Sequence, residues 1–334
     1  MADRPLEGQV ALVAGATRGA GRGIACMLGA AGATVYCTGR SGGGQTSPMG
    51  RPETIEQTAA LVSQHGGEGV AVRVDHTREE DVAALIARIQ AERGRLDILV
   101  NDIWGGDPMV DWSAGKFWQL DIATVRALID QAVVSHMITA RHAAPLMLQR
   151  GRGLIVEVSD GHHDGYRGHL LYDLVKNTVN RLGYAMAWDL HGTGVTALTV
   201  CPGFLRSEAV LDHFGVTEET WREAIAKDPF FAESESPFLV GRAVAALAAD
   251  PRVHEKAGRV LFASDLAREY GFTDPDGRAP DFHGMFEHVT AQLAGKEDEL
   301  GRDERFLVFA RYLQIHREPD QADKARVLAA KLGL

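Results

Sequence analysis

A strand, a glycine-rich turn and a helix follow one another at the start of the chain, and this order constrains the fold more than any other feature. Residues 9–14 are mostly apolar and predict a short buried strand. Gly15, Gly19 and Gly21 follow, before the apolar helical run 24–28. Glycines here permit a tight turn and let a pyrophosphate approach the N-terminus of the helix. Such turns also occur for structural reasons alone, but the strand–turn–helix context favours a dinucleotide site.

Two arginines accompany this turn. Arg18 lies inside it, and Arg40 follows the second predicted strand, residues 34–38. An acid at the tip of that strand holds the ribose 2′-hydroxyl of NAD, whereas arginine accommodates the 2′-phosphate of NADP. Either arginine alone could be a solvated charge, but two guanidinium groups at one place suit a phosphate dianion. The sequence therefore predicts NADP(H) as cofactor.

Strands and helices continue to alternate along the chain, which is typical of an α/β fold with a doubly wound, mostly parallel sheet. Further strands are predicted at 69–74, 96–101, 154–159 and 195–200, and helices at 79–92, 124–149 and 170–190. Asp75 closes the third strand, where a carboxylate could accept a hydrogen bond from an adenine amino group. Asn101 closes the fourth strand.

Tyr172 and Lys176 stand four residues apart on a predicted helix and therefore share one face. A free tyrosine titrates near ~10. A lysine cation beside it favours the phenolate and brings its pKa toward the working range of an acid/base catalyst. Ser159 ends a strand one loop earlier, so a hydroxyl and a phenol are expected at one carbonyl oxygen.

These motifs together resemble the short-chain dehydrogenases/reductases. The family's order and approximate intervals are matched by Gly15-x-x-x-Gly19-x-Gly21, Asp75, Asn101, Ser159, Tyr172-x-x-x-Lys176 and Pro202-Gly203. The match covers roughly residues 6–265. Two later stretches, 235–251 and 264–278, resemble the branch of the family that contains dehydrogenase/reductase member 1.

The resemblance implies a Rossmann-type sheet of seven strands in a three-layer α/β/α arrangement. Tyr172 would be the general acid/base, Lys176 would lower its pKa and bind the nicotinamide ribose, and Ser159 would hydrogen-bond the carbonyl oxygen. Tyr172 and Lys176 would also belong to the cofactor site, whose other residues would be Gly15, Thr17, Arg18, Gly19, Gly21, Arg40, Asp75, Asn101, Pro202, Gly203 and Ser207. Pro202 and Gly203 would flank the nicotinamide. Ser207 stands where the family usually has a threonine that touches the nicotinamide amide.

The chain departs from the family pattern near the expected active site. The usual Asn-Asn-Ala-Gly is here Asn101-Asp102-Ile103-Trp104, which changes a pocket wall. The asparagine of the usual catalytic tetrad falls at Ala132, which cannot relay a proton. Ser135 and His136, one turn further on, are the candidates to replace it.

Charge and apolar content argue against nucleic acid and membranes as partners. A formal charge of −10 argues against nucleic acid and anionic membranes as partners. No apolar run approaches the ~20 residues of a membrane span. Residues 1–5 lack the apolar core of a signal peptide, so a cytoplasmic protein is expected.

Neither a disulfide nor a metal is expected. The three cysteines, Cys26, Cys37 and Cys201, are far apart and form no metal-binding pair. One loop carries four candidate ligands, which lack the spacing of a metal site and favour a polar substrate or water network. They are His162, His163, Asp164 and His169.

Residues 1–280 are predicted to form one domain, and residues 281–334 a helical C-terminal extension. Residues 206–234 read as a helical flap over the pocket, with core packing of their aromatic residues as the alternative. The aromatic loop from Trp104 to Trp118 is interpreted as facing the substrate, with packing alone as the alternative. The helices at 124–149 and 170–190 carry more apolar residues than one sheet face needs, which favours a homodimer or homotetramer.

The sequence therefore predicts an NADP(H)-dependent oxidoreductase that acts on a carbonyl or secondary alcohol. One alternative is an epimerase or dehydratase of the extended branch, which usually carries GxxGxxG rather than the spacing found here. Another is a non-catalytic NADP(H)-sensing protein on the same scaffold. Such proteins usually lose Tyr172 or Lys176, and this chain has both.

Overall fold

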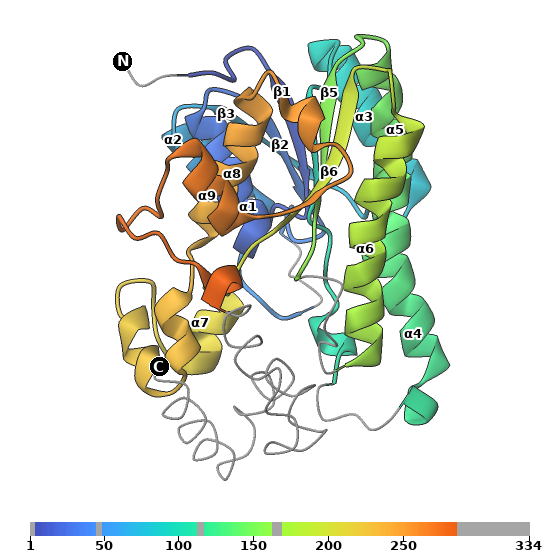
Figure 1. Cartoon of the computed structure of the whole chain (residues 1–334). Coiled ribbons are helices and arrows are strands. Elements are labelled where there is room, and N and C mark those ends of the chain that lie inside the picture. The colour runs from blue at the N-terminus through green and yellow to red at the C-terminus, as the bar shows by residue number, and fades with distance from the viewer. Residues whose placement is uncertain (1–3, 45–48, 112–116, 162–168, 286–334) are drawn as a thin grey trace.

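Seven parallel strands form the central layer of the molecule (Figure 1). A computed structural model describes residues 4–44, 49–111, 117–161 and 169–285. The strands are β1 (Val10–Ala14), β2 (Thr34–Gly39), β3 (Glu68–Arg73), β4 (Ile98–Asn101), β5 (Gly153–Val158), β6 (Val195–Cys201) and β7 (Val260–Phe262). Their order is β3-β2-β1-β4-β5-β6-β7, and each neighbouring pair is parallel. The predicted seven-stranded Rossmann-type sheet is confirmed.

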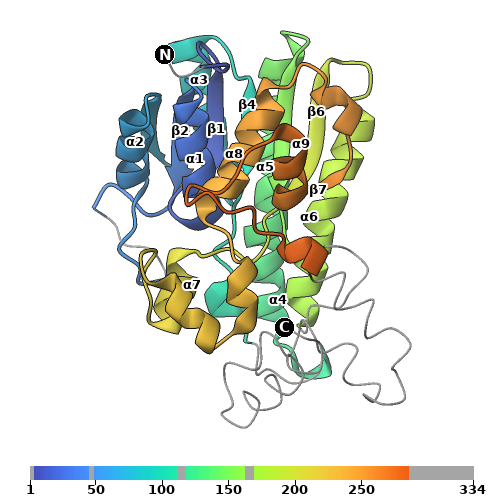
Figure 2. The ribbon, with the colours of Figure 1, turned by 60° about the vertical axis from the view of Figure 1, so that its left-hand side comes forward.

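Helices cover both faces of this sheet (Figures 1 and 2). One face carries α1 (Gly19–Ala30), α2 (Ile55–Gln64), α8 (Pro237–Ala249) and α9 (Ala263–Tyr270). The other carries α3 (Glu79–Arg93), α5 (Ser135–Leu148) and α6 (Leu170–Asp189), with α4 (Ile122–Ile129) continuing the line of α5. From β1 the strand order runs outward to β2 and β3 on one side and to β4–β7 on the other, so the order switches between β1 and β4. In such sheets ligands bind outside the carboxyl ends of the strands at this switch point.

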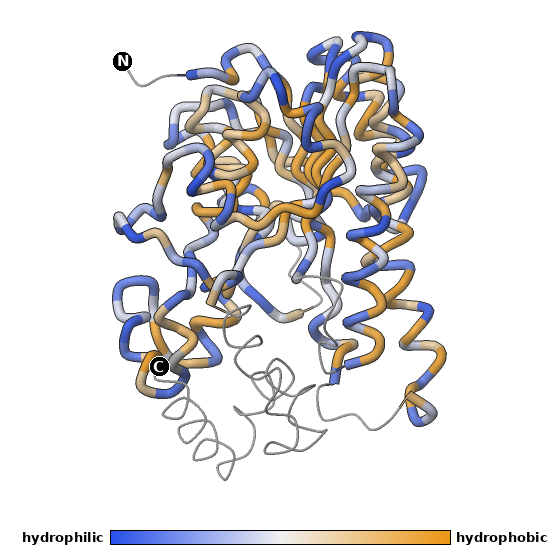
Figure 3. Tube along the Cα trace, in the orientation of Figure 1, coloured by the Kyte–Doolittle hydropathy of each residue, from blue (hydrophilic) through white to orange (hydrophobic). Residues whose placement is uncertain are grey.

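The central strands β1, β4, β5 and β6 are buried on both faces, and Figure 3 shows the sheet as the hydrophobic centre of the fold. Along β1 the side chains alternate: Ala11 and Val13 pack with the α1 and α8 layer. Val10 and Leu12 pack with the α3 and α5 layer. Burial on both faces is typical of strands in a parallel sheet, which explains why they read as continuous apolar runs rather than as alternating ones.

The single long helix predicted at 124–149 is interrupted. A π-helical turn at Asp130–Val134 separates α4 from α5. Single π-helical turns inside helices often occur at functional sites. Ala132 lies within this turn and is buried.

The predicted flap region is helical and lies beneath the carboxyl ends of the strands (Figure 1). It contains α7 (Glu208–Phe214) and two 3-10 helices, Trp221–Ala226 and Pro229–Glu233. Trp221 and Phe231 are buried in a small apolar cluster of this region, so they form its local core. The buried Arg206 forms ion pairs with two carboxylates, since its Nη2 lies 2.7 Å from Glu218 Oε1 and 3.3 Å from Asp274 Oδ2. These contacts link the flap region to the segment that follows α9.

Several predictions fall on residues outside the described ranges. They concern the C-terminal extension beyond Met285, the loop residues His162, His163 and Asp164, and Trp112. In the described part of the chain, no helix is long and apolar enough to cross a membrane.

Candidate active site

A cavity of about 500 Å³ lies at the carboxyl ends of the central strands. Most of the predicted site residues line it: Gly15, Thr17, Arg18, Gly19, Arg40, Asp75, Ser159, Tyr172, Lys176, Pro202, Gly203 and Ser207. Segments that are far apart in the sequence therefore meet here, because parallel strands place all their carboxyl ends at one edge of the sheet.

The glycine turn is shaped by two close approaches. Gly15 has a φ of +94°, and a Cβ there would overlap the carbonyl of Asp102. A Cβ on Gly21 would overlap the Gly15 carbonyl and lie 2.8 Å from Asp102 Oδ2. Gly21 thus does not line the cavity but lets α1 pack against the turn. The result is a cradle of bare backbone of the kind that a pyrophosphate needs.

Arg18 is a partly buried cation with spare hydrogen-bonding capacity. Its Nη1 lies 3.7 Å from Glu53 Oε2 and has no hydrogen-bond partner within the described residues. Burial lowers the pKa of Arg18, an effect that the charge of Glu53 partly offsets. Arg40 approaches Gly105, where an added Cβ would lie 2.8 Å from its Nη2. Arg18 and Arg40 both line the cavity, and their role in binding a phosphate stays a prediction.

A carboxylate of the flap region already contacts the N-terminus of α1. Glu208 Oε2 accepts a hydrogen bond from the Gly19 amide at 2.8 Å, and its Oε1 lies 3.2 Å from Arg22 Nη1. An anion at this end of a helix is stabilised by the free amides and by the helix dipole. This contact indicates that the predicted anion site can hold a negative charge.

The hydroxyl of Tyr172 donates to Asp160 Oδ2 at 2.5 Å. Ser159 was predicted at this place, but its hydroxyl donates to the backbone carbonyl of Lys176 at 2.8 Å. Ser159 and Asp160 are the first two residues after β5, which ends at Val158. Side chains of successive residues in an extended chain point in different directions. The sequence reasoning missed Asp160, although the Ser-Asp pair after the strand was a signal that either side chain could face the tyrosine.

Lys176 lies beside Tyr172 as the four-residue spacing predicts. Its Nζ is 5.5 Å from the centre of the Tyr172 ring and 4.4 Å from that of Trp104. Trp104 meets Tyr172 edge to face at 5.5 Å between ring centres, and its indole nitrogen donates to Asp107. The tryptophan that departs from the family pattern therefore forms a wall of the cavity next to the catalytic candidates. Phe117 and Trp118, later in the same loop, are 64% and 69% exposed.

Two acidic residues of the cavity have shifted pKa values in opposite directions. Burial raises the pKa of Asp102 to about 7, an effect that Lys176 and the Gly21 amide oppose. The pKa of Asp75 is instead lowered: burial raises it, but hydrogen bonds from Thr77 and the charge of Arg40 outweigh this effect.

Asn101 points into the core rather than into the cavity. Its Nδ2 donates to Glu157 Oε1 at 2.8 Å. Glu157 Oε2 lies 2.5 Å from His136 Nδ1, and His136 Nε2 lies 2.9 Å from the Ile103 carbonyl. The Asn101 side chain is therefore held in a buried network and does not line the cavity, and its predicted cofactor contact stays a prediction.

Neither candidate for the missing asparagine reaches the cavity. His136 is held by Glu157, and the hydroxyl of Ser135 donates to the Gln131 carbonyl at 2.7 Å. Gln131, next to Ala132 in the π-helical turn, does line the cavity. The sequence count did not single it out.

Pro202, Gly203 and Ser207 follow β6 and line the cavity. The Ser207 hydroxyl caps α7 by accepting from the Val210 amide at 3.3 Å. Behind Gly203 lies Glu235, which is 1% exposed. Burial and the neighbouring Asp274 raise the pKa of Glu235 to about 8, while the Gly203 amide and Arg206 lower it.

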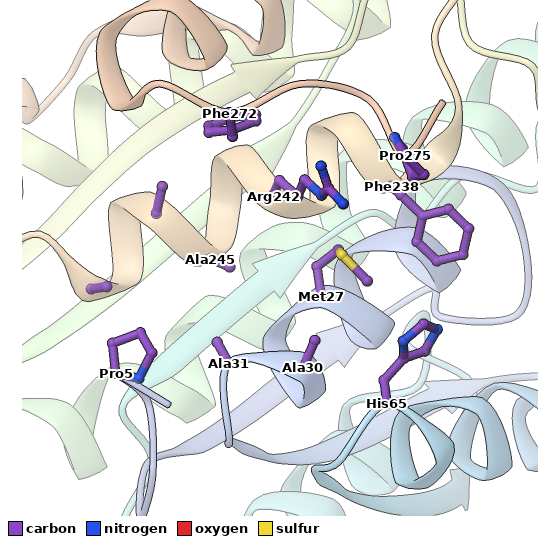
Figure 4. Close-up of a pocket in the computed structure, with 12 residues that line it drawn as sticks. Pro5, Met27, Ala30, Ala31, His65, Phe238, Arg242, Ala245, Phe272 and Pro275 are labelled. Atoms are coloured by element: carbon purple, nitrogen blue, oxygen red, sulfur yellow. The ribbon is translucent and has the colours of Figure 1, made fainter. Parts of the chain in front are cut away.

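A second cavity, of about 590 Å³, lies on the outer side between α1 and α8 (Figure 4). Its walls are mostly apolar, with His65 and Arg242 as the polar residues labelled there. Within the described ranges, no group of three or more potential metal ligands occurs.

The chain belongs to the short-chain dehydrogenase family, whose model matches residues 9–213. This family transfers a hydride between a nicotinamide cofactor, NAD or NADP, and a carbonyl or alcohol group. The chain is thus an oxidoreductase, and its small-molecule substrate and nicotinamide cofactor follow from this membership.

Among similar proteins is the dehydrogenase/reductase SDR family member 1 of Mus musculus, 35% identical over 82% of this chain and 85% of its own length. The Homo sapiens protein of the same name is 32% identical over 87% of this chain and 91% of its own length. A 7α-hydroxysteroid dehydrogenase solved with NADH and a 7-oxo bile acid has the same fold. Its TM-score is 0.63 at 22% identity, covering 85% of this chain and 99% of that one.

Proposed function

We propose that this protein is an NADP(H)-dependent oxidoreductase that interconverts a carbonyl and a secondary alcohol, with Tyr172 as the general acid/base. The observation that carries the proposal is that Tyr172 and Lys176 line the same cavity as the glycine turn and the two arginines. Both hydroxysteroid and sugar-acid dehydrogenases occur among the similar proteins, which supports an alcohol or carbonyl as the substrate group.

The residues present fit a dinucleotide phosphate. The close packing at Gly15 and Gly21 leaves no room for side chains and keeps the turn as bare backbone. The buried Nη1 of Arg18 has no hydrogen-bond partner within the described residues, which suits an anion. Arg18 and Arg40 would hold the 2′-phosphate, and Lys176 the nicotinamide ribose. When bound, the nicotinamide supplies or accepts the hydride. Tyr172 holds the proton that moves to or from the substrate oxygen, while the ammonium of Lys176 stabilises its phenolate.

Titration calorimetry with NADPH and NADH tests the cofactor assignment. NADPH is expected to bind at least about tenfold more tightly, since a charge-assisted hydrogen bond contributes about 1.5–3 kcal/mol. Arg40→Ala should remove most of this preference, whereas Arg88→Ala, on the outer side of α3, should leave it unchanged. Equal affinities in the wild type would refute NADP(H) as the preferred cofactor.

Substitution Tyr172→Phe tests the acid/base assignment, because it removes only the hydroxyl. With a carbonyl substrate, kcat is expected to fall about 10²–10⁴-fold while NADPH affinity stays the same. Normal turnover by this variant would contradict the mechanism. A wild type that binds NADPH tightly but reduces no substrate in a broad carbonyl screen would favour the sensing alternative.

We further propose that the chain forms a homodimer or homotetramer through α5 and α6. These helices lie side by side at one edge of the molecule (Figure 1). They expose large apolar side chains, namely Met137, Leu148, Leu170, Leu174, Tyr184 and Trp188, the last being 66% exposed. An apolar patch of this kind usually marks a protein interface.

A further inference from the structure

The side chain of Gln131 is a buried amide in the wall of the cavity. It is 6% exposed and lies in the π-helical turn between α4 and α5. Its backbone carbonyl accepts from the Ser135 hydroxyl at 2.7 Å, but its side-chain amide has no hydrogen bond to the described residues. Because a buried amide without a partner is unfavourable, such a group in a cavity wall indicates a ligand that pairs with it.

Polar side chains on one helix face show which end of the cavity Gln131 occupies. Gln131, Ser135 and Thr139 are spaced by four residues and share a face. Thr139 Oγ1 lies 2.9 Å from His76 Nδ1, and His76 follows Asp75 just after β3. This face is therefore turned toward the β2 and β3 side of the sheet, away from β5 and β6.

Arg40 and Gln131 meet at Gly105. The φ of Gly105 is +78°, and a Cβ added there would lie 2.8 Å from Arg40 Nη2 and 3.4 Å from Gln131 Nε2. Arg40 directly follows β2, and the tip of the second strand contacts the adenosine ribose or its phosphate in dinucleotide sites of this kind. Gln131 therefore lies in the adenosine half of the cavity.

Gln131 offers a pair of hydrogen-bonding groups that its charged neighbours lack. The guanidinium of Arg40 only donates hydrogen bonds, and the ionised carboxylate of Asp75 only accepts them. An amide has a donor and an acceptor side by side. Adenine presents the complementary pair, its amino group as donor and N7 as acceptor, and glutamine pairs with this edge through two hydrogen bonds.

We propose that Gln131 binds the adenine base of the cofactor, its amide oxygen accepting from the amino group and its amide nitrogen donating to N7. The adenine amino group carries two hydrogens, so this contact does not compete with the one predicted for Asp75. The proposal rests on the nicotinamide cofactor of the proposed function. It does not depend on the choice between NADPH and NADH, because both carry adenine.

Titration calorimetry on the full-length protein tests the contact. The two ligands are NADPH and its hypoxanthine analogue, in which a carbonyl oxygen replaces the adenine amino group. Gln131→Leu keeps the approximate size but removes donor and acceptor, and should weaken NADPH binding at least about fivefold. The preference of the wild type for NADPH over the analogue should fall at least about threefold. Gln149→Leu, an exposed site directly after α5, is the control and should change neither affinity.

Thermal unfolding without cofactor separates a binding role from a structural one. Since the Gln131 amide has no hydrogen bond to the described residues, Gln131→Leu should leave the melting temperature unchanged or raise it. Unchanged NADPH affinity in this variant, an equal loss for both ligands, or a lowered melting temperature would overturn the assignment and leave the proposed function standing. Failure of the wild type to bind either NADPH or NADH would overturn both.

Discussion

Replacing His136 with leucine tests how much the buried pair of His136 and Glu157 contributes to stability. Both ring nitrogens of His136 face acceptors, Glu157 at 2.5 Å and the Ile103 carbonyl at 2.9 Å, an arrangement that favours the imidazolium form with hydrogen on both nitrogens. Burial lowers the pKa of His136, but the charge and hydrogen bond of Glu157 outweigh this effect and raise it overall. His136 and Glu157 are only 2% and 0% exposed, so solvent cannot replace either partner.

Removal of one partner leaves an uncompensated buried charge, which costs about 3–5 kcal/mol. We expect His136→Leu and Glu157→Leu each to lower the free energy of unfolding by about this amount. The double variant should lose about 1–3 kcal/mol less than the sum, because no lone charge remains. His142→Leu, on the same helix, is the control: its ring lies 3.0 Å from the half-exposed Glu79, and such a pair contributes about 0–1 kcal/mol.

The pH dependence of this effect has a defined sign. Since folding raises the pKa of His136, its stabilisation is fully present below the unfolded value of about 6.5 and is lost as the pH rises through the folded value. The difference between wild type and His136→Leu should therefore be larger at pH 6 than at pH 9. Urea unfolding followed by circular dichroism measures it. Additive single losses, or a His136→Leu cost no larger than that of His142→Leu, would refute the buried ion pair.

Three further predictions concern other parts of the molecule. The pKa of Glu235 is raised from 4.5 to about 8, so the folded protein loses stability as the pH rises between these values; Glu235→Gln should be increasingly more stable than wild type over that range in thermal unfolding, and a constant difference would contradict the shift. Glu208→Gln should strengthen NADPH binding several-fold in calorimetry at low salt, because the Glu208 carboxylate repels a phosphate at the α1 N-terminus; Glu219→Gln, an exposed site on the same flap, should not. Light scattering at micromolar concentration should give a mass of at least twice 36.1 kDa, and Trp188→Glu should lower it; a monomeric wild type would refute the interface.

Periodicity and turn chemistry were enough to predict the sheet, since they act locally. The apolar runs predict β1, β4 and β5, and the glycine turn predicts the positive φ angles of Gly15 and Gly19, without reference to distant residues. The four-residue spacing of Tyr172 and Lys176 likewise fixes a shared helix face before any packing is known. The family resemblance added the strand number and the roles that spacing alone does not define.

Tertiary structure decided which side chains meet across these elements. Asp160 and Ser159 are neighbours in sequence, and only the packing of β5 against α6 determines that Asp160 contacts the tyrosine while Ser159 contacts a carbonyl. The position of Asn101 at the end of a strand predicts a site residue. Its side chain instead donates to Glu157 and to the His136 carbonyl, which lie in the core. Such contacts depend on the direction of each side chain and on partners tens of residues away, which a one-dimensional pattern does not encode.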